Sequence, residues 1–304
     1  MEEQKENLPQ DGGSELCGAS TPKCTHDGNE EKGNHPSTTT HYSNPVFKEI
    51  AVANGYINRM SKDELRAKLL EVKLDTRGVK DVLKKRLKNY YKRQKLNHVF
   101  QDSSNHDSYY DYICVIDFEA TCEEGNPSDY VHEIIEFPIV LLNTRTLEID
   151  IVDAADSFPQ VLQNVVDWMR QKELGMKYKY AILTDGSWDM SKFLNMQCRT
   201  SRLKFPRFAK KWINIRKAYG NYYKVTRTQT KLTMMLEKLG MSYDGRPHSG
   251  LDDSRNIARI AIHMLRDGCE LRVNERMHAG QLMTVASSLP IEGAPIPQSP
   301  HFKT

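Results

Sequence analysis

Hydrophobic positions with helical spacing first gather between about residues 60 and 90. Ser61 and Glu64 have the spacing of a capping box, and the leucines that follow them predict a short amphipathic helix. A second apolar stripe, from Val79 to Leu87, predicts another helix. Two short helices bury only a small core, so we expect this unit of about 35 residues to be marginally stable alone.

From residue 109 onward, short apolar runs alternate with helical patterns. Strands are expected at 113–119, 134–142, 180–183 and, more weakly, 212–215. Helices are expected after a capping box at Ser157 and Gln160, and at 232–239 and 257–265. Strands that alternate with helices predict an α/β fold.

The two ends of the chain lack such patterns. Residues 1–45 are rich in Gly, Ser, Thr, Asn and Glu, and prolines recur from about residue 285. The expected organisation is therefore a disordered acidic tail at 1–45, a helical domain at 57–95, an α/β domain at 109–270 and a Pro-containing tail at 285–304.

Composition narrows the class of protein. Hydrophobic residues make up 38% of the chain, and the longest apolar run, Ile134–Leu142, contains Glu136 and is less than half of the ~20 residues that a transmembrane helix needs. The N-terminus is acidic and polar, unlike a secretory signal. Six cysteines without a repeating spacing fit a reducing compartment. These features exclude a membrane protein and predict a nuclear or cytosolic one.

Positive charge is concentrated in one block. Residues 59–95 carry fourteen Lys and Arg and five acids, a net charge of +9, whereas residues 1–50 carry nine acids and four lysines, a net charge of −5. A short basic block of this kind is typical of a phosphate-binding module. A solvated helical face is the alternative interpretation.

A pair of acids interrupts the first predicted strand of the α/β domain. Asp117 and Glu119 lie two residues apart, so both carboxylates project from one face of that strand. Two neighbouring anions are costly unless a cation neutralises them, and a divalent metal ion is the natural candidate. An Asp-x-Glu pair also arises about once by chance in a chain this acidic, so a surface pair is the alternative.

A third acid follows a later strand. Asp189 comes after 180–183 and a short turn, at the point where α/β sheets bind ligands. Asp185 is a competing candidate in the same turn. Asp189 is favoured because Met190–Leu194 predicts a helix that begins there, and because the adjacent Trp188 offers a face on which a base can stack. A helix cap and an ordinary core tryptophan are the alternatives.

The last chemically suggestive pair precedes the final helix. His248 and Asp253 are five residues apart with Gly250 between them, and the helix is expected to begin near Asp252. The loop can therefore aim the imidazole into a site that the carboxylate enters from the first helical turn. A loop histidine bonded to backbone and a helix-capping acid are the alternatives.

The order of these motifs resembles the DEDDh 3′-to-5′ exonuclease superfamily. The segments I-D-F-E-A-T-C, T-D-G-S-W-D-M and R-P-H-S-G-L-D-D-S-R-N-I-A are similar to those of exoribonucleases that trim histone-mRNA 3′ ends and act in enhanced RNAi, from about residue 45 to the C-terminus. Arg59–Arg93 resembles a SAP domain in its leucine spacing and its turn at Gly78.

This resemblance implies a ribonuclease H-like exonuclease domain with a mixed sheet, preceded by a small helical SAP-like domain. It implies that two Mg²⁺ are held by Asp117, Glu119, Asp189 and Asp253, with His248 as the general base. The terminal nucleotide would contact Glu119, Ala120, Trp188 and His248. A structured RNA would be gripped through Arg77, Lys80, Lys84 and Lys88.

The same resemblance implies substrates, partners and location. The implied substrates are the histone mRNA 3′ stem-loop, ribosomal RNA 3′ ends and small interfering RNA overhangs, each trimmed with release of nucleoside 5′-monophosphates. The implied partners are the stem-loop binding protein and ribosomes, without a membrane or an implied oligomer. The implied location is the cytoplasm and the nucleus, including the nucleolus; Lys84–Lys88 also fits a nuclear import signal, which is a weak motif.

The chain departs from the family between its first and second motifs. Family members carry a full third strand there, and a Thr-Gly turn that lines the nucleotide pocket, but no Thr-Gly dipeptide occurs between Glu119 and Asp189. About two to three dozen residues are therefore expected to be missing near 150–155, as in an alternatively spliced form, with part of the sheet edge and of the pocket wall.

Three functional hypotheses follow. The first is an active exoribonuclease. The second is a catalytically impaired splice-type form that binds RNA stem-loops, and the third is a chromatin protein that binds DNA through the SAP-like unit. Residues 210–224 interleave basic and aromatic residues, which suits a guide for single-stranded RNA or, alternatively, an ordinary strand and loop.

Overall fold

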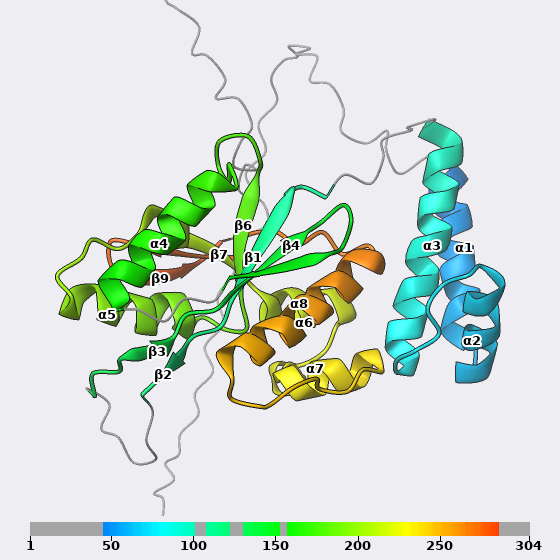
Figure 1. Ribbon diagram of the computed structural model, residues 1–304. Helices are drawn as coiled ribbons and strands as arrows, with labels where there is room; N and C mark the ends of the chain where they lie inside the picture. The colour runs from blue at the N-terminus through cyan, green and yellow to red at the C-terminus, as the bar shows by residue number, and fades with distance from the viewer. Residues whose placement is uncertain (1–44, 101–107, 122–129, 153–156, 286–304) are drawn as a thin grey trace, which may run out of the picture. The chain divides into compact units, whose positions relative to one another are not determined.

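The computed structural model describes residues 45–100, 108–121, 130–152 and 157–285, with side chains at 98–100 excepted (Figure 1). The predicted tails lie outside these residues, apart from Pro45 and Val285. Residues 153–156, which overlap the expected site of the shortening at 150–155, also lie outside them. Within the described part, no helix has the length and apolar character needed to cross a membrane.

Three helices form the N-terminal domain: α1 (Pro45–Arg59), α2 (Lys62–Glu71) and α3 (Lys80–Phe100). The capping box that starts α2 is confirmed, because the Ser61 hydroxyl accepts from the Glu64 N–H at 3.2 Å and the Glu64 carboxylate accepts from the Ser61 N–H at 2.6 Å. The small core consists of Ile57, Leu65, Leu69, Leu83 and Leu87. The expectation of two helices is wrong by one, because α1, in which Val46 and Ile57 are buried, was not predicted.

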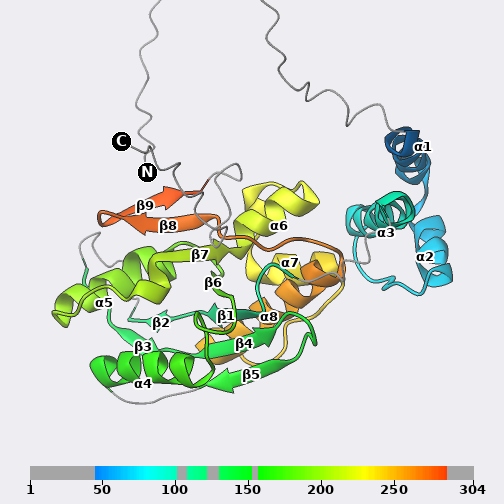
Figure 2. The ribbon, with the colours of Figure 1, turned by 90° about the horizontal axis from the view of Figure 1, so that it is seen from above.

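The α/β domain is built on one seven-stranded sheet. In spatial order its strands are β5 (Ile149–Val152), β4 (Ile139–Asn143), β1 (Tyr112–Ile116), β6 (Tyr180–Thr184), β7 (Lys211–Asn214), β8 (Glu275–His278) and β9 (Gln281–Thr284). The β1, β6 and β7 strands are parallel, and the remaining neighbours pair antiparallel. The predicted mixed sheet is thus confirmed, and Figure 2 shows β8 and β9 continuing it beyond β7.

Helices cover both faces of this sheet. Residues of α6 (Ile215–Tyr223), α7 (Leu232–Leu239) and α8 (Gly250–Arg266) share a core with Ile113 and Val115 of β1. Residues of α4 (Phe158–Gln171) and α5 (Asn195–Thr200) share the opposite core with Cys114 and Ile116. The alternation of side chains along β1 therefore places one apolar layer on each side.

Shorter elements complete the domain. They are β2 (Glu119–Ala120), which pairs with β3 (Ile134–Glu136), the π-helix Asp189–Leu194, and the 3₁₀ turns Arg207–Lys210 and Arg227–Gln229. The predicted strand at 134–142 is in fact β3 and β4, separated at Phe137 and Pro138.

Three further expectations need correction. The sheet edge expected to be lost is occupied by β5, although all four of its residues are exposed or half-exposed. The α/β sheet continues past residue 270 through β8 and β9. Ser157 precedes α4 as expected but makes no side-chain capping hydrogen bond.

The helical core gives a stability prediction. Leu69→Ala should lower the free energy of unfolding by about 2–5 kcal/mol, because this fully buried side chain would leave a cavity in a core of few residues. The neighbouring Leu70→Ala is the control, since Leu70 is 71% exposed. Urea unfolding measures the free energy of unfolding of both variants, and hydrogen exchange in α2 and α3 shows whether the change is local to this domain. Equal losses of stability in the two variants would contradict this core.

Candidate metal centre and active site

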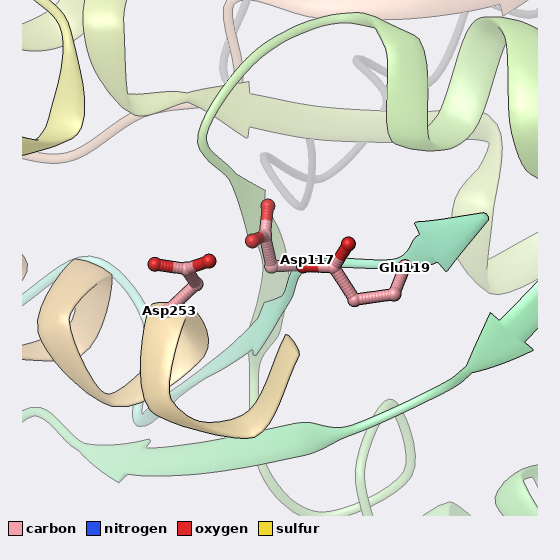
Figure 3. A group of neighbouring side chains, drawn as sticks. All are labelled: Asp117, Glu119 and Asp253. Atoms are coloured by element: carbon pink, nitrogen blue, oxygen red, sulfur yellow. The ribbon is translucent and has the colours of Figure 1, made fainter. Parts of the chain in front are cut away.

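Three carboxylates meet where β1 ends. Asp117 directly follows β1, Glu119 begins β2, and Asp253 lies in the first turn of α8. Each offers an oxygen, and these atoms lie within 4.8 Å of one another (Figure 3). The structure thus brings the first and third predicted motifs together.

A glycine permits this close approach. A Cβ atom at Gly250 would lie 2.8 Å from the carbonyl oxygen of Asp117, which is too close for any other residue without a shift. The Gly250 N–H also donates to the Glu136 carboxylate at 2.7 Å, which joins the start of α8 to the end of β3. The missing side chain is therefore what lets Asp253 reach Asp117.

Asp189 stands beside the three carboxylates without belonging to their 4.8 Å group. It is buried at the start of the π-helix, and one carboxylate oxygen accepts from the Phe118 N–H at 3.0 Å. The competing Asp185 is instead paired with the guanidinium of Arg216. Asp189 is thus anchored to the strand end that carries Asp117, and Asp185 already has a cationic partner.

The pKa values of Asp117, Glu119 and Asp189 are raised by burial and by neighbouring negative charges. Burial, followed by the charge of Asp189, raises the pKa of Asp117 well above its usual range. Burial also raises the pKa of Asp189 to about 7, and burial and the Asp253 charge raise that of Glu119. Such shifts mean that the ionised carboxylates are under-neutralised, so the oxygen-only donor set fits a divalent cation such as Mg²⁺.

The His248 loop is held against Asp253. His248 has φ 63°, in the left-handed region, and its N–H donates to the Asp253 carboxylate at 3.2 Å. The Tyr243 hydroxyl donates to the other oxygen of Asp253 at 2.6 Å. His248 itself is exposed, and its backbone is held one turn from Asp253 by the hydrogen bond of its N–H.

A cleft of about 870 Å³ opens beside these residues. Its lining includes Asp117, Phe118, Trp188, Asp189 and Arg216. Trp188 is 63% exposed and lines the cleft; its ring meets Phe193 edge-on and has the Lys192 ammonium 4.5 Å from its centroid. Ala120, the remaining residue expected at the nucleotide, lies in β2 opposite Ile134.

The predicted RNA-binding residues are not equivalent. Lys80 is exposed and Lys84 half-buried on α3. Arg77 is paired with Asp75 at 2.7 Å, and the Lys88 ammonium donates to the Asn58 side chain at 2.6 Å. Lys80 and Lys84 are therefore better placed to meet phosphate than the other two.

Several residues of consequence were missed. Arg86, one of the flanking basic residues, is buried and forms an ion pair with Asp267 at 2.5 Å, which a run of Lys and Arg cannot reveal. Arg216 lies in the basic and aromatic stretch 210–224, but its ion pair with Asp185 was not predicted. The sequence did offer a signal for Tyr243: a buried carboxylate such as Asp253 needs hydrogen-bond donors, and Tyr243 lies ten residues before it.

This fold and carboxylate centre define a DEDDh-type, metal-dependent exonuclease. An Exonuclease family model matches residues 144–261, and a SAP domain model matches 57–92. The human "3'-5' exoribonuclease 1" is 67% identical over 313 residues, covering 93% of this chain and 89% of that protein; the mouse protein of the same name is 66% identical. The chain therefore belongs to the 3′-5′ exoribonuclease 1 family, and it is a 3′-5′ exoribonuclease.

Solved structures agree with this assignment. A structure described as "3'-end specific recognition of histone mRNA stem-loop by 3'-exonuclease" is 68% identical, covers 86% of this chain and all of its own, and has a TM-score of 0.61. The nuclease domain of 3'hExo, "a DEDDh family member, bound to rAMP", is 66% identical, covers 56% of this chain and all of its own, and has a TM-score of 0.54.

The match to the human protein also bears on the expected shortening. Since 93% of 304 residues is about 283, a match over 313 positions has about 30 positions at which this chain contributes no residue. That number is close to the two to three dozen residues expected to be missing, and their position near 150–155 stays a prediction.

The pKa shifts predict how metal-free protein responds to pH. The pKa of Asp189 is higher in the folded chain (about 7) than in the unfolded chain (about 3.8), so folding stability should fall as pH rises through that interval. Asp189→Asn should weaken this fall, and Mg²⁺ should raise the melting temperature more at pH 8 than at pH 5. Thermal melts in EDTA and in MgCl₂ measure both effects; an Asp189→Asn profile parallel to that of the wild type would contradict the account.

Proposed function

We propose that this exoribonuclease trims the 3′ end of structured RNA, with the histone mRNA stem-loop as its principal substrate. The proposal rests on one observation above all: three carboxylates from β1, β2 and α8 converge beside a cleft that presents Trp188. It is supported by a 68% identical 3′-exonuclease whose structure concerns recognition of that stem-loop. Ribosomal RNA 3′ ends and small interfering RNA overhangs offer the same chemistry as further substrates.

In this proposal the acidic residues hold two Mg²⁺. Asp117, Glu119 and Asp253 provide the shared ligand group, and Asp189 provides the neighbouring carboxylate. The bound ions would lower the pKa of a water molecule and stabilise the leaving 3′ oxygen. His248 takes the proton of the attacking water from the exposed side of the site, and Trp188 stacks on the terminal base.

The SAP domain supplies the grip on the stem. Lys80 and Lys84 lie one turn apart on α3, so their ammonium groups can meet phosphates of a folded RNA without reading its sequence. Binding at this domain would keep the RNA attached while its 3′ end is shortened in the cleft.

Loss of one metal ligand should separate cleavage from binding. Asp117→Asn should reduce trimming of a labelled stem-loop by about 10³-fold or more while leaving its affinity within about threefold, because Asp117 acts on the metal and not on the stem. Asp150→Asn is the control, since Asp150 is an exposed carboxylate on β5 that is paired with Lys172. Gel analysis of products and filter binding give the two readouts.

The same assay decides between the active enzyme and the impaired form. Trimming by the wild type that EDTA abolishes supports the enzyme. Stem-loop binding without any trimming would favour the catalytically impaired form. The roughly 30 positions of the human protein's match that have no residue in this chain are the observation that motivates this alternative. Tighter binding to duplex DNA than to the RNA stem-loop would favour a chromatin role instead.

The α3 lysines make a prediction about salt. Lys80→Ala and Lys84→Ala should each weaken stem-loop binding and reduce the slope of log affinity against log salt by about 1, because each removes about one phosphate contact. Lys95→Ala is the control on the same helix, since Lys95 is paired with Glu49 at 2.7 Å. Equal effects of all three variants would contradict a specific docking face.

A further inference from the structure

A buried carboxylate on the β8–β9 hairpin has no role in the chemistry described above. Glu275 begins β8 with a side chain that is 0% exposed, opposite Trp212 of β7. One of its oxygens accepts from the Trp212 indole N–H at 2.7 Å. The other accepts from the Ser187 hydroxyl at 2.9 Å and forms an ion pair with Lys217 at 2.8 Å. A buried acid with three donors is a fixed point of the structure.

Ser187 connects this fixed point to the cleft. It immediately precedes Trp188, and its carbonyl oxygen accepts from both the N–H and the hydroxyl of Ser191, at 3.0 and 2.6 Å. The turn between β6 and the π-helix is therefore tied to Glu275 at Ser187, the residue before Trp188. Asp189 has its own anchor at the Phe118 N–H, whereas the contacts of the exposed Trp188 ring are edge-on to Phe193 and with the Lys192 ammonium.

Most of the positive charge along the cleft is already paired. Of the three basic residues that line it, Arg216 is paired with Asp185 and Lys217 with Glu275, and Arg227 is the third. Trp212, Tyr219 and Tyr223, from the stretch considered above as an RNA guide, are buried in the cores. The hydrogen bonds of Glu275 are therefore best explained as support for the turn that contains Ser187.

We propose that Glu275 is a positioning residue of the nuclease: by holding Ser187, it fixes the turn that presents Trp188 to the terminal nucleotide. The inference rests on the exoribonuclease activity of this site. It also assigns a purpose to the β8–β9 hairpin, which lies beyond the residues matched by the Exonuclease model. A tryptophan held in place before binding costs less conformational entropy when the base stacks on it.

The test compares Ser187→Ala, Glu275→Gln and the double variant in the full-length chain. Ser187→Ala removes the hydrogen bond to Glu275 and the longer one that the Ser187 hydroxyl accepts from the Asn214 side chain at 3.4 Å, and it leaves Glu275 with Trp212 and Lys217. We expect it to raise KM by about five- to tenfold, which corresponds to about 1 to 1.4 kcal/mol, and to leave kcat within about twofold. Hydrogen exchange in residues 184–191 should become faster.

Tyr223→Phe is the matched control, because it also removes a hydroxyl that donates to a buried carboxylate, Asp267, at 2.8 Å, but outside the cleft. It should change the melting temperature without changing KM. The double variant should raise KM no further than the larger single effect, because Ser187 acts through Glu275.

Three results would overturn the proposal: an unchanged exchange rate at 184–191 in Ser187→Ala, a KM shift in Tyr223→Phe equal to that in Ser187→Ala, or single effects that multiply in the double variant. A wild-type chain without activity would refute the nuclease account alone. The exchange measurement would then still decide whether Glu275 fixes the turn.

Discussion

Repulsion between carboxylates at the end of β1 is the constraint on which the rest of the structure depends. Asp117, Glu119 and Asp253 are held together by covalent geometry and by the close contact of α8 with the strand, and Asp189 adds its charge from the buried side. Folding alone would not favour such a group, because burial disfavours each ionised form. A cation that binds here recovers that cost, so the unfavourable electrostatics of the metal-free chain and its proposed metal affinity have one origin.

The surrounding fold acts mainly to keep this group from relaxing apart. Gly250 allows helix and strand to touch, and Arg216 neutralises Asp185, so that one acid of the neighbourhood is satisfied without metal. At the other wall of the cleft, the network around Glu275 secures the turn that carries Trp188. The acidic ligands and the aromatic face therefore have separate supports, and a change in one can be distinguished from a change in the other.

Sequence alone predicted the elements whose patterns are local. The capping box of α2 and the continuous apolar run of β1 are each encoded within a few residues, and both are present. The order of the acid motifs also predicted the site, since Asp117, Glu119 and Asp253 converge as expected. What could not be predicted depends on partners that are distant in sequence. The sequence around Arg86 suggests a surface cation, and only the folded structure shows its ion pair with Asp267. Likewise, the role of Glu275 is visible only once β8 pairs with β7. The edge strand β5 was not predicted, although Ile149, Asp150 and Ile151 alternate between apolar and polar; its four residues are exposed or half-exposed, so they contribute little to either core.

The central claim is that these carboxylates form a divalent metal centre, and a crystal of the chain soaked with Mn²⁺ tests it most directly. Anomalous scattering should reveal manganese bound by Asp117, Glu119 and Asp253 at the end of β1, with Asp189 beside it, and Asp117→Asn should remove that signal. Anomalous density elsewhere with this site empty, or a signal that persists unchanged in Asp117→Asn, would contradict the account.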